Sequence, residues 1–515
     1  MKKIFLYGPP GSGKSTVGKE VADCLGVGFL DLDAAVQQKV GRSIAEIMTA
    51  QGEPAFRAME TASLRDAAAG QAGVIALGGG TLLHGKNRSL VESAGTVVFL
   101  DAGLETLAAR LGTDGAVRPL LSGDLPERLK VLLQKRRKHY DSFGLRINTE
   151  ALDPGQLSRE IQIAAGRFRL DGMGAGYDVL VQPGGIDCLG GLLRERGLEG
   201  PVALVTDENV GSLYAGRVAA SLGAAGYKLQ VVTHPAGEEA KTLETVSGFW
   251  REFLGAGLER RSTVVALGGG VTGDLAGFAT AAFLRGIAWA AVPTSLLAMV
   301  DASLGGKTGF DLPEGKNLIG AFHPPHLVLA DPQTLATLPE AELRSGLAEV
   351  VKHGVLADPQ LFAACAAGLE AVKGDLEGLV RRAMAVKVAS VRADPYEDGA
   401  RAALNLGHTV GHALEVVSGY RLRHGEAVAI GLVAEARLAE RLGLARPGLS
   451  RQIACVLAGL GLPVEVPPGL PRLALIQAMG VDKKKAAGVV RFALPVEIGK
   501  VVIGVAVEDL NQLFT

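Results

Sequence analysis

The clearest chemical signal is a glycine-rich loop near the N-terminus, Gly8-Pro-Pro-Gly-Ser-Gly-Lys-Ser15, which fits the pattern G-x-x-x-x-G-K-[ST]. An apolar run precedes it and a helix-like stretch, residues 17–25, follows. Such a loop turns backbone N–H groups inward, its lysine reaches the β- and γ-phosphates, and its hydroxyl binds Mg²⁺. A glycine-rich turn without a ligand is the alternative, but the flanking strand and helix favour phosphate binding. The expected nucleotide-binding residues are Gly8, Gly11, Ser12, Gly13, Lys14, Ser15 and Thr16.

A second group of reactive residues lies in the C-terminal half. His408 and His412 are four residues apart, so they share one face of a helix. His424 adds a third imidazole and Glu349 a carboxylate. Two histidines, one carboxylate and an open position are typical of a catalytic zinc site, in which the ion acts as a Lewis acid. For a single helical histidine such as His353, an ordinary core role is the better interpretation.

A second glycine-rich turn, residues 268–274, follows the apolar run 264–267 and precedes a helix-like stretch. It is of the dinucleotide-binding type but not a strict GxGxxG, so alone it is weak evidence. Segments rich in glycine, lysine and asparagine surround it, at residues 235–241, 293–298, 301–309 and 315–324. This density favours close backbone approach to a ligand over packing alone.

Length and composition limit the classes of function. A chain of 515 residues is expected to form about two to four domains. The formal net charge of -1 argues against a nucleic-acid partner, which would need a basic surface. The 4 cysteines have no paired spacing, as expected for a reducing compartment. The apolar runs are too short for a signal peptide or a membrane span, so we expect a cytoplasmic protein that does not bind membranes.

The pattern of elements predicts an α/β fold. Up to about Thr149, short β-rich runs at 4–7, 74–77 and 97–100 alternate with helical patterns, as in a parallel sheet. A second α/β pattern has strands expected at 177–181, 202–206, 229–233, 262–267 and 287–292. Past about Pro332 the strands are expected to stop, and residues 340–460 have helical periodicity. The predicted domains are 1–165, 166–330 and 331–515.

Several residues could bind the molecule that accepts the phosphate, but the role of each is ambiguous when it is taken alone. Asp31 and Asp33 end a strand-like run, and strict alternation would send both carboxylates to one face. One could hold Mg²⁺ and the other an acceptor hydroxyl, although a solvated pair is equally compatible. Arg57 could be a surface charge, Arg118 a loop arginine, and residues 78–80 a plain turn.

Taken together, these residues resemble the shikimate kinase family over residues 1 to about 165. The resemblance implies a P-loop kinase fold that uses ATP with Mg²⁺, with Ser15 and Asp31 at the metal and Lys14 and Arg118 at the transferring phosphoryl group. The residues implied to bind shikimate are Asp33 (nearest the reacting hydroxyl), Arg57, Gly78, Gly79, Gly80 and Arg136, with Arg137 as the neighbouring alternative. The chain departs from the family in lacking Pro-Leu before Tyr140 and in having Gly144 where alanine is common.

Residues 170 to 515 resemble the 3-dehydroquinate synthase family, whose fold is a Rossmann-like α/β domain followed by a mostly helical domain. The resemblance implies Zn²⁺ or Co²⁺ on Glu349, His408 and His424, with His412 as a proton-handling neighbour. NAD is implied to contact Asp207, Asn209, Glu238, Lys241, Gly269, Gly270, Asp274, Thr294 and Ser295. The residues implied to contact substrate are Arg285, Asp301, Lys307, Lys316, Asn317, Lys352, Lys387, Glu397, Arg401, Asn405 and one of Lys483 and Lys484. Asp311 and Ser295 stand where the family more often has asparagine and threonine.

The two resemblances imply a bifunctional enzyme of aromatic-precursor synthesis. One half would phosphorylate shikimate. The other would convert 3-deoxy-D-arabino-heptulosonate 7-phosphate to 3-dehydroquinate, with release of phosphate and regeneration of NAD. A homodimer through the synthase half is expected. Two alternatives stay open: the N-terminal half as another P-loop small-molecule kinase or nucleotide sensor, and the C-terminal half as a metal-dependent polyol dehydrogenase.

Overall fold

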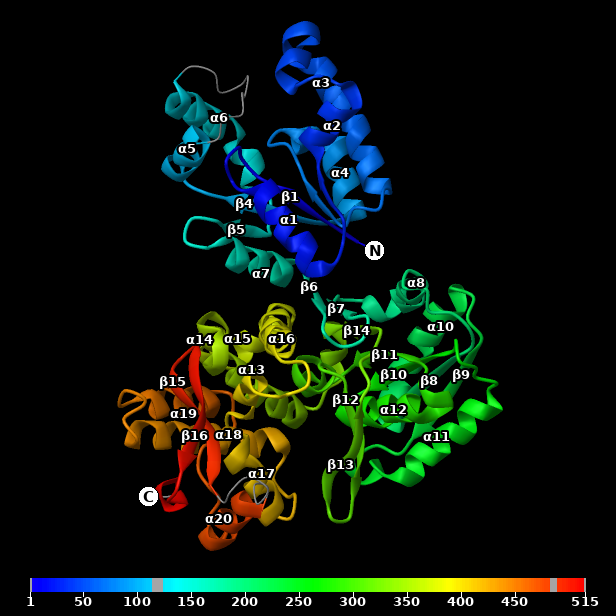
Figure 1. Ribbon diagram of the computed structural model, residues 1–515, viewed down its shortest axis with the longest axis vertical. Helices are drawn as coiled ribbons and strands as arrows, with labels where there is room; N and C mark the ends of the chain where they lie inside the picture. The colour runs from blue at the N-terminus through cyan, green and yellow to red at the C-terminus, as the bar shows by residue number, and fades with distance from the viewer. Residues whose placement is uncertain (1, 114–123, 482–488, 514–515) are drawn as a thin grey trace. The chain divides into compact units, whose positions relative to one another are not determined.

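The computed structural model describes residues 2–113, 124–481 and 489–513 (Figure 1). Contacts divide the chain into two compact units, Met1–Phe168 and Arg169–Thr515. The finer division of the second unit near residue 330 stays a prediction.

The first unit is a five-stranded parallel sheet with helices between its strands (Figure 1). The sheet order is β2-β3-β1-β4-β5. Its strands are β1 (Lys3–Tyr7), β2 (Phe29–Asp31), β3 (Val74–Ala76), β4 (Gly95–Asp101) and β5 (Arg146–Asn148). Its helices are α1 (Lys14–Leu25), α2 (Leu32–Val40), α3 (Ile44–Ala69), α4 (Gly85–Ala94), α5 (Leu104–Thr113), α6 (Leu125–Tyr140) and α7 (Pro154–Ala165).

The central strand β1 is buried on both faces. Ile4 and Leu6 belong to one apolar cluster with residues of α1 and α7, and Phe5 and Tyr7 to another on the opposite face. Alternation along the strand produces this division, and it explains the uninterrupted apolar run in the sequence. Because β1 is central and ends at Tyr7, the loop that begins at Gly8 lies at the carboxyl edge of the sheet.

One local expectation was wrong. Asp31 is the last residue of β2, but Asp33 already belongs to α2, so strand alternation does not relate the two carboxylates. Asp31 instead caps this helix, since its carboxylate accepts a hydrogen bond from the Ala34 N–H. A short strand that ends in an N-cap residue cannot be distinguished by alternation from a longer strand.

The second unit begins with a seven-stranded sheet whose order is β6-β7-β14-β11-β10-β8-β9. The strands are β6 (Arg167–Leu170), which spans the boundary of the units, β7 (Tyr177–Val181), β8 (Val202–Asp207), β9 (Leu229–His234), β10 (Thr263–Gly268), β11 (Ala288–Pro293) and β14 (Leu327–Ala330). The pairs from β7 to β9 are parallel. The helices of this part are α8 (Leu189–Arg194), α9 (Glu208–Val210), α10 (Gly216–Ala224), α11 (Leu243–Gly255) and α12 (Gly270–Ala282).

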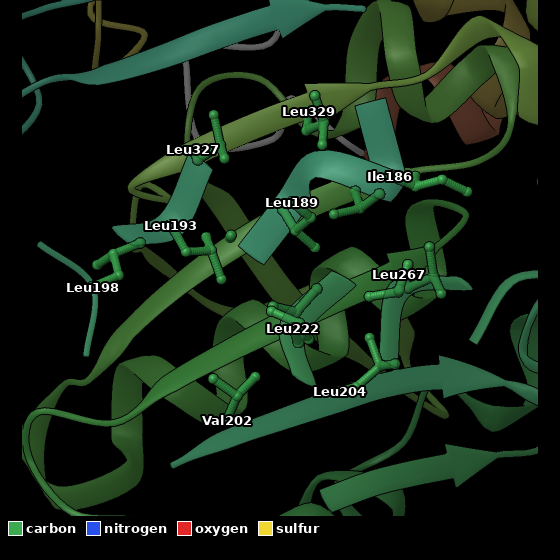
Figure 2. Packing of buried hydrophobic residues seen from close by; sticks show 14 of the residues in the cluster. Ile186, Leu189, Leu193, Leu198, Val202, Leu204, Leu222, Leu267, Leu327 and Leu329 are labelled. Carbon is green, nitrogen blue, oxygen red and sulfur yellow. The ribbon is translucent and has the colours of Figure 1, made fainter. Parts of the chain in front are cut away.

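The core of this sheet is aliphatic (Figure 2). Leu204 and Leu267, from adjacent strands, share a cluster with Leu189 of α8 and Leu222 of α10. The five strands predicted between residues 177 and 292 are all present, each within one residue of its expected ends.

The rest of the second unit is mainly helical. It comprises α13 (Glu340–Ala357), α14 (Pro359–Ala366), α15 (Leu369–Gly374), α16 (Leu376–Ala393), α17 (His408–Val417), α18 (His424–Arg441), α19 (Leu449–Gly459) and α20 (Arg472–Val481). The expectation that strands stop after about Pro332 was wrong, because β15 (Val490–Glu497) and β16 (Lys500–Val507) form an antiparallel hairpin. A second hairpin, β12 (Lys307–Leu312) with β13 (Gly315–Phe322), occupies the glycine- and lysine-rich segment where no strand was expected.

Of the helices within the described ranges, none combines the length and the apolar character needed to cross a bilayer.

We expect Leu204→Ala to lower the free energy of unfolding of the second unit by about 2–5 kcal/mol, because it leaves a cavity in a fully buried layer. The chain's 2 tryptophans, Trp250 and Trp289, both lie in this unit, so their fluorescence during denaturant unfolding measures its stability alone. Leu254→Ala is the control, since Leu254 is 65% exposed. An equal effect of both substitutions would contradict the assignment of this core.

Candidate active sites

The N-terminal glycine loop has the shape of an anion site. A Cβ at Gly8 would lie 2.3 Å from the Leu100 carbonyl oxygen, so only glycine fits there. Gly13 has φ 88° and precedes α1 without a side-chain cap. The first N–H groups of α1 therefore face the loop, where the helix dipole favours negative charge.

The loop also brings a cation and a metal-binding pair together. The Lys14 ammonium donates to the carbonyl oxygens of Gly8 and Pro9 at 2.9 and 2.8 Å. The Ser15 hydroxyl donates to the Asp31 carboxylate. A hydroxyl beside a carboxylate at a phosphate loop is a donor set that suits Mg²⁺.

A cavity of about 1390 Å³ adjoins this loop. The predicted residues that line it are Gly11, Ser12, Gly13, Lys14, Ser15, Thr16, Asp31, Asp33, Arg57, Gly78, Gly79, Gly80 and Arg136. Arg118 lies outside the described residues, so its expected role stays a prediction. The cavity thus brings the nucleotide loop and the expected acceptor residues to one place.

A buried glutamate orients the acceptor side of the cavity. Glu60 is 1% exposed; it forms an ion pair with Arg57 at 2.9 Å and accepts a hydrogen bond of 2.5 Å from the Thr81 hydroxyl. A Cβ at Gly80 would lie 2.7 Å from the Arg57 guanidinium, so a larger residue here would displace the Arg57 side chain. Glu60 was not predicted as a site residue, although its spacing of three residues from Arg57 on a helix was a usable signal for the pair.

Asp33 is poised to titrate near neutral pH. Its burial and the nearby carboxylates of Glu60 and Asp31 raise the pKa of Asp33 to about 6, against the opposing effect of Lys14 and Arg57. A carboxylate with such a pKa, facing a cavity, suits general-base chemistry.

The two adjacent arginines of α6 face different ways. Arg136 is buried, lines the cavity and donates to the Gly79 carbonyl oxygen at 2.8 Å. The Arg137 side chain is 83% exposed and pairs with Asp141. The geometry favours Arg136 as the carboxylate-binding residue, which stays a prediction.

In the second unit, three helices bring Glu349, His408 and His424 together. The Nε2 atoms of His408 and His424 lie 3.3 and 3.4 Å from the same Glu349 oxygen. The histidines are the first residues of α17 and α18, and Glu349 lies within α13. Gly425 permits this approach, because a Cβ there would lie 2.0 Å from the Ser345 carbonyl oxygen of α13.

The charges in this cluster favour a bound cation. Neither Glu349 oxygen has a hydrogen-bond donor in proper geometry among the described residues, although Lys352 and both histidines are within ion-pair distance. Burial would raise the pKa of Glu349, but Lys352 and His408 hold it well below its usual range. A buried, ionised carboxylate with unused lone pairs beside two imidazoles fits a divalent metal ion.

Further contacts fix the orientation of both imidazoles. His424 Nδ1 lies 3.2 Å from the Glu415 carboxylate, and His408 Nδ1 lies 3.1 Å from the Leu406 carbonyl oxygen. With Nδ1 as the donor, each ring turns its Nε2 lone pair toward Glu349. Glu415 was not predicted from the sequence, although its spacing of three residues from His412 on α17 was a usable signal. The His412 ring lies 5.3 Å from the His408 ring, in the expected neighbourhood.

Beside the metal cluster is a second charged group. Asp301 lies in a π-helical turn, a feature often found at functional sites, and pairs with Lys387 at 2.7 Å. Burial opposes ionisation of Asp301, but the charges of Lys387 and Lys352 lower its pKa. His353 is fully buried, and burial lowers its pKa to about 3.

The expected nicotinamide residues gather at the carboxyl ends of adjacent strands. Asp207 ends β8, Gly269 follows β10, and Thr294 follows β11. In the chain, β9 follows β8 and lies on one side of it in the sheet, and the next strand, β10, lies on the other side of β8. Dinucleotides bind at such a switch point. No side chain caps α12 at Gly269, so its N-terminal N–H groups suit a pyrophosphate.

The hairpin β12–β13 adds charged residues to this edge. Lys241 pairs with Asp274 at 2.7 Å and donates to the Asn317 side-chain oxygen at 2.6 Å. Lys316 lies 3.3 Å from Glu238. Asn317 and Lys316, expected at the substrate, therefore contact residues expected at NAD.

The remaining predicted substrate residues are less closely grouped. Lys307 forms an ion pair with Glu397, and burial together with Arg401 and Lys387 lowers the pKa of Lys307 to about 8. Arg285 and Asn405 are exposed, and no described contact joins either to Lys307. Lys483 and Lys484 lie outside the described residues. These roles stay predictions.

Comparison with known proteins finds matches for both units. Residues 10–164 match the family model for shikimate kinase. Residues 231–345 and 346–485 match those for the N-terminal and C-terminal parts of 3-dehydroquinate synthase. The 3-dehydroquinate synthase of a Synechococcus species is 47% identical over 336 residues, which are 64% of this chain and 91% of the relative.

The chain belongs to the shikimate kinase and 3-dehydroquinate synthase families.

The synthase of Pelobacter propionicus is 46% identical over 65% of this chain and 95% of its own length. Among solved structures, 2-epi-5-epi-valiolone synthase of Streptomyces hygroscopicus, with NAD⁺ and Zn²⁺ bound, has a TM-score of 0.60 and 31% identity. That match covers 65% of this chain and 94% of the other. The chain is a fusion of a kinase half and a synthase half, which explains why each family model and each of these relatives matches only part of it.

We expect Glu415→Gln to weaken zinc binding to the synthase half about 10- to 100-fold, because the neutral amide no longer orients and polarises His424. Competition with a chromophoric chelator measures this affinity without any assay of activity. Glu370→Gln is the matched control, since the Glu370 side chain is 87% exposed and pairs only on the surface. Equal zinc affinity in the Glu415 variant and the wild type would refute the role of Glu415.

Proposed function

We propose that this chain carries two activities: phosphorylation of shikimate by ATP, and conversion of 3-deoxy-D-arabino-heptulosonate 7-phosphate to 3-dehydroquinate with release of phosphate. The observation that carries the proposal is the convergence of Glu349, His408 and His424. Asp301 lies beside Glu349, and its π-helical turn lines the same pocket as the glycine-rich turn after β10. The kinase activity rests equally on a single cavity that holds the phosphate loop and the acceptor residues.

In the kinase half, the shikimate hydroxyl attacks the γ-phosphorus of ATP, and the bond from that phosphorus to the bridging oxygen of ADP breaks. Asp33 accepts the hydroxyl proton, which its raised pKa permits. Lys14 and the N–H groups of α1 stabilise the phosphates, and Arg57 and Arg136 hold the acceptor. Mg²⁺ is assigned to Ser15 and Asp31.

In the synthase half, Glu349, His408 and His424 would hold Zn²⁺ or Co²⁺, and the edge formed by Asp207, Gly269 and Thr294 would hold NAD. When bound, these groups supply reversible hydride acceptance and polarisation of the ring alcohol, and neither is consumed. The donor set fits a metal ion because its two imidazoles and one carboxylate leave a position open.

The charged residues of the synthase half then bind and orient the substrate. Lys307 offers a cation to the phosphate, and Arg401 offers one to the carboxylate. The Asp301–Lys387 pair and Lys352 are placed to hydrogen-bond ring hydroxyls beside the metal cluster. His412, close to His408, is assigned a proton-handling role. Excess positive charge suits a substrate that carries both a phosphate and a carboxylate.

The proposal includes a cytoplasmic homodimer that joins through the synthase half. Leu284 and Arg285 are exposed and adopt consecutive left-handed conformations, with φ 50° and 69°. Such strain in residues other than glycine is typical of functional surfaces. The four free cysteines agree with a reducing compartment.

A paired assay on the full chain tests both activities. We expect ADP formation from ATP with shikimate, and phosphate release from the heptulosonate phosphate with NAD and Zn²⁺. Lys14→Met should abolish only the first and Glu349→Gln only the second, so each variant is the control for the other. Accumulation of NADH without phosphate release would instead support the polyol dehydrogenase, and ADP formation that does not depend on shikimate would support another kinase.

The kinase should show an acidic limb in its pH profile. Because Asp33 must be ionised to accept a proton and its pKa is raised to about 6, kcat/KM for shikimate should fall about tenfold for each pH unit below that value. Asp33→Asn should lower kcat by about 10²- to 10⁴-fold and remove this limb. An unchanged limb in the variant would assign the titration to another group.

A further inference from the structure

Tyr7 connects the nucleotide loop of the kinase half to the acceptor turn. It is the last residue of β1, fully buried, and directly precedes Gly8. Its hydroxyl lies 3.2 Å from the Gly79 carbonyl oxygen and 3.1 Å from His139 Nε2. A Cβ at Gly79 would lie 3.1 Å from the Gly8 carbonyl oxygen, so the acceptor turn packs directly against the start of the phosphate loop.

The Gly79 carbonyl has more donors than it can bind well. Arg136 Nη1 and the Tyr140 hydroxyl each donate to it at 2.8 Å. A carbonyl oxygen has two lone pairs, so Tyr7 is a third and more distant donor. Tyr7 has one hydroxyl proton and two possible acceptors, Gly79 and His139.

With the neutral ring protonated on Nδ1, the protonation state of His139 decides between these acceptors. A neutral ring with its lone pair on Nε2 accepts the Tyr7 proton, which leaves two donors on Gly79. A protonated ring can only donate, so it donates to the Tyr7 oxygen, and the Tyr7 proton then has only the Gly79 oxygen as acceptor. Protonation of His139 therefore directs the Tyr7 hydroxyl to the Gly79 oxygen as its one remaining acceptor.

We propose that Tyr7 and His139 are a pair of positioning residues that hold the Gly79 carbonyl, and that the pair makes the affinity for shikimate depend on the protonation of His139. This inference rests on the proposed kinase function. Neither residue lines the cavity, so both act on the substrate through residues that do, and the hydrogen bond from Tyr7 links them to the turn of residues 78–80.

The surroundings of the pair fix the direction of the effect. On His139, burial and the positive charges of Arg88 on α4 and Arg136 on α6 lower the pKa, so the ring gains its proton at a lower pH than an ordinary imidazole does. The Phe143 and Phe99 rings, which also pack in this region, carry no charge.

Tyr7 keeps its proton throughout this range. Burial and the nearby Tyr140 raise the pKa of Tyr7, and the charges of Arg136, Glu60 and Arg57 also face it. The carboxylate of shikimate stays ionised above about pH 5. Affinity for the acceptor should therefore increase as the pH falls through the pKa of His139.

The test compares KM for shikimate in the full chain with that of Tyr7→Phe and His139→Gln between about pH 5 and about pH 8. In both variants, KM divided by the wild-type value should be near one at the upper pH and rise to about 2- to 10-fold at the lower, as expected for the loss of one hydrogen bond. This ratio cancels the titration of Asp33. KM for ATP and kcat should keep their wild-type values at every pH.

Three outcomes would overturn the inference: a ratio of one throughout, an elevation that is the same at every pH, or an equal change in KM for ATP. Tyr214→Phe is the matched control, because it removes a buried hydroxyl that donates to a carbonyl at 3.0 Å in the synthase half. His139 is partly exposed, so its glutamine variant provides the test even if Tyr7→Phe does not fold. Failure of the wild type to phosphorylate shikimate would refute the proposed function instead.

Discussion

The fully buried carboxylate of Glu349 is the constraint on which the synthase half depends. An ionised carboxylate in an apolar interior is costly unless cations or metal ions compensate it. Lys352 and the two histidines surround it, and they come from three helices that must pack closely. Gly431 of α18 lies so close to α17 that a Cβ would be 2.0 Å from the Gly407 carbonyl oxygen. The site can therefore form only if these helices pack closely.

The kinase half meets the same electrostatic problem with backbone groups and paired side chains. Its loop presents N–H groups at the start of α1, and buried Glu60 keeps Arg57 directed at the acceptor turn. Every described residue assigned to the kinase reaction lies in the first unit and every one assigned to the synthase reaction in the second. Among the described residues, each unit therefore holds the charged groups assigned to its own ligands.

Sequence patterns predicted the elements whose residues are constrained locally. The apolar strands between residues 177 and 292 were found because a parallel strand is buried on both faces. Alternation failed at Asp33, which belongs to α2, and periodicity missed the hairpin β15–β16. β15 is largely buried, but its partner β16 is largely exposed, so the hairpin has no regular alternation to detect.

The sequence by itself determined both families and the phosphate loop, because these depend on residue types at short, fixed spacings. The triad of Glu349, His408 and His424 followed from the family resemblance, and the fold brings its members together. The fold alone decided the partners: Glu415 on His424, Asp301 with Lys387, and Asn317 with Lys241 rather than with Lys307. It also gave a role to His139, a departure from the family pattern, by placing its ring against Tyr7 across 132 residues of chain. The contacts of Asp301, Asn317 and His139 join distant segments, and no local spacing encodes them.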